Sequence, residues 1–358
     1  MTIREKYFET IKKFIPRPEI RSSVGLDIGR TSCKLIELMK KGDGCEVLTW
    51  AVEPIVGGDV QQSIRTILTK LSQPCLSPTT AVLGKGTLIR YIDMPKMNLA
   101  DLKKSFAFEA DKYFPFPSDQ IYTDCYILAP KEKENKITVL VAAVKKDIID
   151  ERIRLLTELN LQADFIGLNA TALANVVHTL GSGNGQGTDA QAPAAEPAEK
   201  DVVAILDIGE AVSNLTIMIG ELPWFTRDIF IGGREFTRSI SNALGISLEE
   251  AEAMKLAPGD KLQSVVDASD SALSNLVSEL RLSCDYFVTE KNLPVPKILL
   301  TGGASRLPGL EEHLEKSLEL KVQRWDPFDA VTVGGQVSAE DLHKNADRLT
   351  AALGLALY

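Results

Sequence analysis

Two stretches of the chain arrange apolar and polar residues in the same order. Residues 24–38 read VGLDIGRTSCKLIEL, and residues 204–218 read AILDIGEAVSNLTIM. In each stretch an apolar run of strand type leads into Asp-x-Gly, small polar residues follow, and a second strand-like run begins. This pattern predicts two β-hairpins, each with a glycine in a tight turn.

The two stretches also align with each other without gaps. Residue 24 matches residue 204, an offset of 180 positions, and both stretches contain the tetrad Leu-Asp-Ile-Gly. A single tetrad of this kind is weak evidence. Two tetrads at equivalent places in two halves indicate an internal duplication.

A third glycine-containing turn follows a strand-like run near the end of the chain. The apolar run 298–301 leads into Gly-Gly-Ala-Ser at 302–305, and a helical pattern covers 311–318. Such a turn places backbone N–H groups where an anion or a polar ligand can bind. Taken alone, it is equally typical of a simple helix entry.

The region between the first hairpin and residue 164 has a mixed α and β pattern. It predicts two short strands in 80–92 around Gly84-Lys85-Gly86, a helix over 99–113, strands over 121–128 and 137–144, and a helix over 147–159. We expect an inserted α+β subdomain here.

Two further segments differ from the rest. Residues 181–200 contain no Val, Ile, Leu, Met or aromatic residue, which predicts a disordered linker between two folded halves. Residues 1–20 place apolar side chains at helical spacing among lysines. This amphipathic segment is compatible with packing on the protein body or with a membrane surface.

The amino-acid composition limits the classes of function that the chain can have. The 358 residues carry a formal net charge of −9, with 44% hydrophobic and 25% charged residues, as in soluble globular proteins. The acidic balance argues against nucleic-acid binding. Without a signal peptide or an apolar run long enough to span a bilayer, we expect a cytoplasmic protein. Five scattered cysteines indicate reduced thiols, and three isolated histidines give no support to zinc or Ser-His-Asp chemistry.

Two hairpins that face each other across a cleft can hold a nucleoside triphosphate. The turn amides would donate to phosphate oxygens, and Asp27 and Asp207 would orient Mg²⁺ through its waters. Lys34 or Arg30 would add positive charge. Two other phosphate-binding motifs are excluded. Gly84-Lys85-Gly86 lacks the Ser or Thr that follows lysine in a P-loop, and no Rossmann glycine pattern follows a strand.

The order of hairpin, hairpin and strand-Gly-Gly resembles the actin-like ATPase superfamily of actin, Hsp70 and sugar kinases. Within it, the chain is similar to the PilM family of type IV pilus assembly proteins, a relative of the cell-division protein FtsA. Besides the two hairpins, the resemblance rests on Phe106–Phe116, VLVAAVKKDIIDE, Thr226–Gly233, Glu249–Lys255 and LLTGGASRLPGL. It covers nearly all of the chain outside the linker.

The resemblance implies an α/β, two-lobed actin-like ATPase fold of duplicated ribonuclease H-like domains with an inserted α+β subdomain like that of FtsA. The implied boundaries are an N-terminal segment (1–20), a first lobe (21–79), the insert (80–164), a connecting helix of the first lobe (165–180), the linker (181–200) and a second lobe (201–358).

The resemblance also implies ATP and Mg²⁺ in the cleft, with Glu252 and Lys255 near the ribose and adenine. From the residues alone, those two are a solvated helix pair at i, i+3. The full set of predicted nucleotide-binding residues is Asp27, Gly29, Arg30, Thr31, Ser32, Lys34, Asp207, Gly209, Ser213, Glu252, Lys255, Gly302, Gly303 and Ser305.

The implied partner is the cytoplasmic N-terminal peptide of a PilN-like membrane protein, held in a groove beside the insert. The protein would be a scaffold at the inner face of the inner membrane, in contact with other pilus platform and motor proteins. Homo-oligomers are compatible with this function. An FtsA-like membrane-associated filament and a small-molecule kinase of the same superfamily are alternatives.

Two departures from the family pattern concern the chemistry. Glu210 stands where relatives carry small residues or Thr, and a carboxylate there repels phosphates unless it points away or meets Mg²⁺. Gly167 and Asn169 stand where relatives often carry carboxylates. Because no residue that positions an attacking water is evident, nucleotide binding is better supported than hydrolysis.

Overall fold

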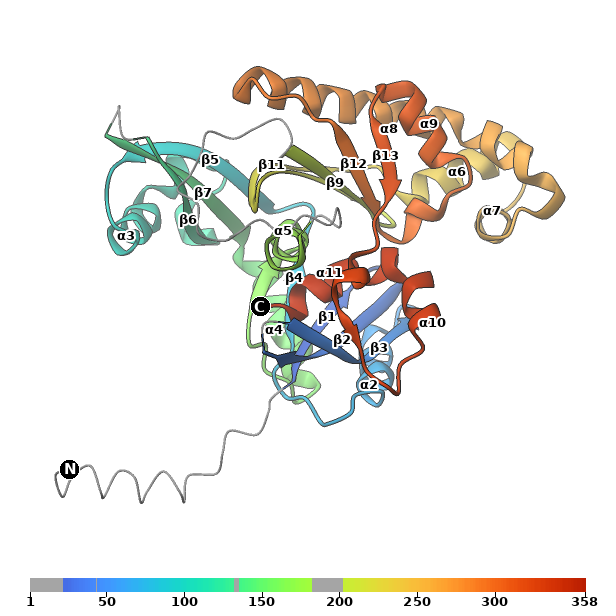
Figure 1. The fold of residues 1–358 in the computed structure, drawn as a ribbon, viewed down its shortest axis with the longest axis horizontal. Coiled ribbons are helices and arrows are strands. Elements are labelled where there is room, and N and C mark those ends of the chain that lie inside the picture. Colours follow the sequence, from blue (N-terminus) through green and yellow to red (C-terminus); the bar gives the residue numbers. More distant parts are fainter. Residues whose placement is uncertain (1–21, 43, 132–134, 182–201) are drawn as a thin grey trace.

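The computed structural model describes residues 22–42, 44–131, 135–181 and 202–358, which form three β-sheets with covering helices (Figure 1). The predicted N-terminal segment and, apart from Gly181, the predicted linker lie outside the described residues.

The first lobe is built on a six-stranded sheet with the order β14-β3-β2-β1-β4-β8. Its strands are β1 (Ser23–Ile28), β2 (Ser32–Lys41), β3 (Gly44–Pro54), β4 (Thr79–Val82), β8 (Ile166–Leu168) and β14 (Thr332–Val333). Helices α2 (Val60–Leu68) and α4 (Lys146–Glu158) contribute Ile64, Ile67 and Leu156 to a core with apolar residues of β1 and β2.

The second lobe is built on a five-stranded sheet with the order β11-β10-β9-β12-β13. Its strands are β9 (Val202–Ile208), β10 (Ser213–Ile219), β11 (Leu222–Ile229), β12 (Lys297–Thr301) and β13 (Lys321–Arg324). Its helices are α6 (Gly233–Leu244), α7 (Leu248–Leu256), α8 (Leu262–Lys291) and α9 (Leu310–Leu318). The 30-residue helix α8 contributes Leu273, Leu276 and Leu280 to the core of this lobe.

The two sheets share one topology, as the duplicated sequence predicts. In the first sheet β3, β2 and β1 are antiparallel neighbours, and β4 and β8 continue in parallel. In the second sheet β11, β10 and β9 are antiparallel neighbours, and β12 and β13 continue in parallel. Each hairpin therefore has a parallel strand beside its first arm, so its turn lies at an equivalent edge of its own sheet.

Helices α5 (Asn169–Leu180) and α11 (Ala346–Ala356) pack between the two sheets (Figure 1). One buried cluster contains residues of both helices together with Ile36 from the first sheet and Ile205 from the second. The helices approach closely, because a Cβ on Gly354 would lie 1.9 Å from the carbonyl oxygen of Ala172. The interface between the lobes is thus a packed core.

The inserted subdomain is a three-stranded antiparallel sheet with the order β5-β7-β6. It contains β5 (Thr87–Pro95), β6 (Ile121–Lys131), β7 (Lys136–Lys145) and helix α3 (Leu99–Glu109). Leu102 and Phe106 of α3 are fully buried against the sheet. The predicted helix over 99–113 ends earlier, and a 3₁₀ turn follows at Ala110–Lys112.

The structure differs from the sequence-based boundaries in two places. Strand β4 and helix α4, predicted within the insert, belong to the first lobe, because β4 pairs with β1 and β8. Beyond β13 the chain returns to the first lobe, where β14 pairs with β3 and α11 packs on β1 and β2. Both differences come from pairing between segments far apart in sequence, which local patterns do not encode.

Two general expectations can be compared with the structure. All five cysteines are free thiols, as their scattered positions predict. No helix in the described ranges is long and apolar enough to cross a membrane.

Candidate functional site

The turns of the two hairpins have the same hydrogen bond. The amide of Gly29 donates to the carbonyl of Ser32 at 3.1 Å, and the amide of Gly209 donates to the carbonyl of Val212 at 3.0 Å. The duplicated sequence therefore produces duplicated turns, and the two aspartates precede the last residues of β1 and β9 in equivalent registers.

Asp27 is neutralised within its own hairpin. Its Oδ2 lies 2.9 Å from the Nζ of Lys34, its direct cross-strand neighbour, and both side chains are largely buried. A second cation lies near this end of β1, because Arg152 of α4 donates to the hydroxyl of Thr80 at 2.7 Å. Burial lowers the pKa of Arg152, and Asp27 is the leading cause that opposes this shift. Local motifs gave no signal for Arg152.

Asp207 obtains its partner from the other lobe. Its Oδ2 accepts a hydrogen bond of 2.6 Å from the amide of Asn169, the first residue of α5. Burial raises the pKa of Asp207 to about 6, and the bond from Asn169 and the charge of Lys34 offset only part of that rise. A cation beside Asp207 would favour its ionised form.

The turn after β12 packs directly on Asp207. Gly302 has φ +90°, and a Cβ there would lie 2.4 Å from both Asp207 Oδ1 and the carbonyl oxygen of Ile208, so the position requires glycine. Gly303 has no atom within 4 Å of its Cβ position and tolerates a side chain. Ser305 is fully buried, and its hydroxyl has no hydrogen-bond partner among the described residues.

Glu252 and Lys255 of α7 also reach this region. Lys255 is buried, and its Nζ lies 2.6 Å from Glu252, 2.9 Å from the hydroxyl of Thr237 and 3.2 Å from the carbonyl of Gly233. A Cβ on Gly233 would lie 3.0 Å from Ala304, in the turn after β12. The solvated pair suggested by the residues alone is therefore wrong for Lys255.

Glu210 is neutralised by arginines of both lobes. Its Oε2 lies 3.5 Å from the Nε of Arg30, and its Oε1 lies 4.0 Å from the Nε of Arg234 at the start of α6. Arg30 and Glu210 occupy equivalent positions of the duplicated motif, each directly after the turn glycine. The charge that departs from the family pattern thus joins one hairpin turn to the other.

Two predicted residues have other contacts. The hydroxyl of Ser213 is buried and donates to the carbonyl of Ile231 at 2.6 Å, so it does not face a ligand. The carbonyl of Thr31 accepts from the amide of Ile55 at 2.8 Å, while the residue itself is exposed. The structure does not bring Ser213 into the candidate nucleotide site.

Residues of the segment Thr226–Gly233 form hydrogen bonds between the second lobe and the insert. The carboxylate of Asp228 accepts from the amide of Gly84 at 2.9 Å, and the hydroxyl of Tyr91 contacts Thr226 at 3.4 Å. These alternate positions of β11 face the insert. The run that resembles the family therefore forms an interface between subdomains.

A cavity of about 520 Å³ lies between the insert, α5 and the β10–β11 hairpin. Its lining is mostly apolar and includes Tyr126, Leu140, Phe165, Leu168, Ala174, Leu222, Pro223 and Tyr358. The Phe165 and Tyr358 rings lie 4.8 Å apart, and the Tyr358 hydroxyl donates to Thr171 at 2.9 Å. We call this cavity the insert groove. Its lining comes from several separate segments, which explains why sequence patterns did not identify these residues.

The chain is similar to known proteins over nearly its whole length. A family model described as type IV pilus assembly protein PilM matches residues 25–358. The solved structure of a PilM-PilN type IV pilus biogenesis complex shares 25% sequence identity and a TM-score of 0.81, covering 94% of this chain and 98% of that chain. Ethanolamine utilization protein EutJ from Carboxydothermus hydrogenoformans shares 15% identity and a TM-score of 0.52, covering 96% of this chain and 91% of its own. With the duplicated sheets, these likenesses establish an α/β fold with two actin-like lobes.

Proposed function

We propose a scaffold function for this chain, which belongs to the PilM family of type IV pilus assembly proteins. In this proposal the protein binds ATP with Mg²⁺ between its lobes and holds the cytoplasmic N-terminal tail of a PilN-like membrane protein. It works in the cytoplasm at the inner face of the inner membrane, beside other platform and motor proteins. The family match favours this function over a kinase or an FtsA-like filament.

Support for a nucleotide comes from the residues around Asp207. Turn amides other than those of Gly29 and Gly209 would hold phosphates, Asp27 and Asp207 would hold Mg²⁺ through water, and Glu252 and Lys255 would lie at the nucleoside. The raised pKa of buried Asp207 fits a group that receives a cation on ligand binding. The charges of bound MgATP would attract groups of both lobes and so favour closure of the lobes.

We propose that hydrolysis is weak. Asn169 stands where relatives often carry a carboxylate, and its amide already donates to Asp207. An amide engaged in this way cannot act as a general base for an attacking water. Asn169 instead ties the first residue of α5 to the second lobe.

Support for the partner comes from the insert groove and from the likeness to a PilM-PilN complex. Strand β6 is an edge strand of the inserted sheet, and its residues line the groove. An edge strand beside an apolar groove suits an extended peptide, which gains main-chain hydrogen bonds and side-chain pockets together.

Helix α5 would connect the two ligands. Its first residue, Asn169, contacts Asp207, while Thr171, Asn175 and His178 on the same helix line the insert groove. A ligand that changes the position of Asp207 therefore acts on a wall of the groove within three turns of helix. Nucleotide and tail would bind with reciprocal coupling.

The test measures the anisotropy of a labelled peptide, the N-terminal tail of the PilN protein from the same organism, with and without ATP and Mg²⁺. We expect Tyr126→Ala, in the groove and 57% exposed, to weaken peptide binding by about tenfold. The matched control is Phe108→Ala on α3, an aromatic residue 83% exposed and outside the groove lining. Equal affinities of Tyr126→Ala and wild type would contradict the proposed groove.

A further inference from the structure

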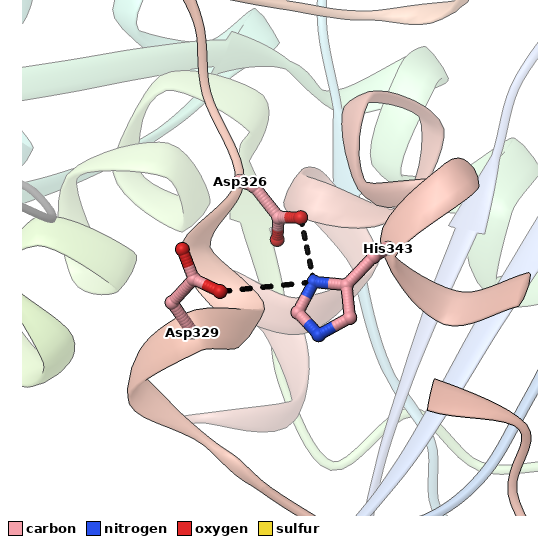
Figure 2. A group of neighbouring side chains, drawn as sticks. All are labelled: Asp326, Asp329 and His343. Carbon is pink, nitrogen blue, oxygen red and sulfur yellow. Dashed lines mark hydrogen bonds and ion pairs between the residues drawn. The ribbon is translucent and has the colours of Figure 1, made fainter. Parts of the chain in front are cut away.

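The segment that returns from the second lobe to the first brings three metal-binding side chains together. After β13, the amide of Trp325 donates to the carbonyl of Leu300 at 2.9 Å, and the 3₁₀ helix η7 (Pro327–Ala330) begins. Helix α10 (Ala339–Lys344) follows β14. Asp326, which precedes η7, Asp329 of η7 and His343 of α10 point toward one another in Figure 2.

The local structure explains why both carboxylates face the same way. Asp326 is the N-cap of η7, and Asp329 is the third residue of this short helix. The Oδ1 of Asp326 accepts from the amide of Phe328 at 3.0 Å, which orients its Oδ2 toward the imidazole. The Nδ1 of His343 lies 2.7 Å from Asp326 Oδ2 and 3.9 Å from Asp329 Oδ1.

His343 differs from the other histidines of the chain. The Nδ1 of His178 lies 3.2 Å from one carboxylate, Glu221, and that of His313 lies 3.8 Å from one carboxylate, Asp270. Among the described residues, only the set around His343 combines three metal-binding groups whose ligand atoms all lie within 4.8 Å of one another.

We propose that Asp326, Asp329 and His343 bind a divalent transition-metal ion of the Zn²⁺ type. One imidazole nitrogen and two carboxylate oxygens suit this class of ion, whereas Mg²⁺ and Ca²⁺ prefer oxygen ligands alone. Tetrahedral bonds of about 2.1 Å place ligand atoms roughly 3.4 Å apart. The 2.7 and 3.9 Å separations reach that value by small side-chain rotations, for which the 80% exposed Asp329 is free. Water would complete the coordination.

The bound ion would hold the returning segment in place. It replaces the proton between His343 and Asp326 and joins η7 to α10 through three bonds. Phe328 of η7 is fully buried in the cluster that contains residues of both sheets. A metal at this point therefore stabilises the connection between the lobes, separately from the nucleotide cleft.

The test titrates ZnCl₂ into chelator-treated full-length protein and follows heat by calorimetry and unfolding by thermal melting. We expect saturable binding of one ion, with Kd below about 100 μM, and a rise in melting temperature. Asp329→Asn should abolish both effects while leaving the melting temperature of the metal-free protein unchanged, because this side chain is mostly exposed. His343→Asn should abolish binding as well.

His313→Asn is the matched control, since it removes a histidine that faces a single carboxylate. It should bind Zn²⁺ as wild type does. Wild-type binding weaker than about 100 μM, or unchanged binding by Asp329→Asn, would overturn the proposed site. Loss of binding in His313→Asn alone would assign the ion to another place and overturn it equally.

Discussion

The two hairpins share a tetrad, a turn and a register, yet they treat their aspartates differently. Lys34 neutralises Asp27 across the first hairpin at 2.9 Å. The equivalent position of the second hairpin is Asn214, whose amide donates to Asp228 instead. Asp207 therefore depends on Asn169 of the other lobe. Duplication thus preserved the backbone while the charges diverged, so that Asp27 has an ion pair and Asp207 only a hydrogen bond.

The largest effect is expected at Gly302, which packs on Asp207. Gly302→Ala places a Cβ 2.4 Å from Asp207 Oδ1 and forces alanine into φ +90°. We expect the free energy of unfolding to fall by about 3 kcal/mol and nucleotide binding to be lost. Gly303→Ala is the control, because its Cβ meets open space. Urea denaturation of both variants checks this; equal stability would contradict the close packing on Asp207.

The next effect concerns the two aspartates themselves. Burial raises the pKa of Asp207 to about 6, above the value of about 4 in an unfolded chain. Its contribution to folding stability is complete below about pH 4 and is lost as the pH rises through about 6. The free energy of unfolding of Asp207→Asn should therefore exceed that of wild type by about 2 kcal/mol at pH 8. At pH 4 the two proteins should have similar free energies of unfolding.

Asp27→Asn sharpens this comparison because it should act in the opposite direction. The change leaves the ammonium of Lys34 largely buried without its partner and should lower stability by about 1 kcal/mol at pH 8. Denaturation of both variants without nucleotide, at each pH, provides the measurement. A stabilising effect of Asp27→Asn would mean that the two acids are equivalent after all.

A smaller effect is expected at the pair that joins the two turns. Glu210→Gln releases Arg30 and removes a carboxylate close to the turn amides that we propose to bind phosphate, so nucleotide affinity should rise about threefold to tenfold. Arg30→Gln should lower the affinity by a similar factor. Titration with a fluorescent ATP analogue at two salt concentrations separates these outcomes. If Glu210→Gln weakened binding, the carboxylate would instead assist Mg²⁺.

The smallest effect is expected where the insert meets the second lobe. Tyr91→Phe removes a partly buried hydroxyl whose contact with Thr226 is long, at 3.4 Å, so we expect a loss of about 0.5–1 kcal/mol. Asp228→Ala is the comparison, since it removes bonds to Gly84 and Asn214 and should cost more. A larger loss for Tyr91→Phe than for Asp228→Ala would reverse their order of importance.

Local sequence patterns determined the parts that depend on neighbouring residues. The hairpins around Asp27 and Asp207, the glycine-containing turn at 302–305 and most helices and strands of the insert follow from turn chemistry and periodicity over a few positions. The internal duplication also predicted the shared topology of the two sheets. These features need no knowledge of distant contacts.

Only the tertiary structure decided which distant groups meet. It pairs Asn169 with Asp207, buries Lys255 beside Gly233, moves β4 into the first sheet and closes the insert groove with Tyr358. Contacts of this kind depend on how whole sheets and helices pack, and the loop entropy and burial that select them are properties of the complete chain. A sequence motif can therefore identify the acidic residue of a site, while tertiary packing decides which group lies beside that residue.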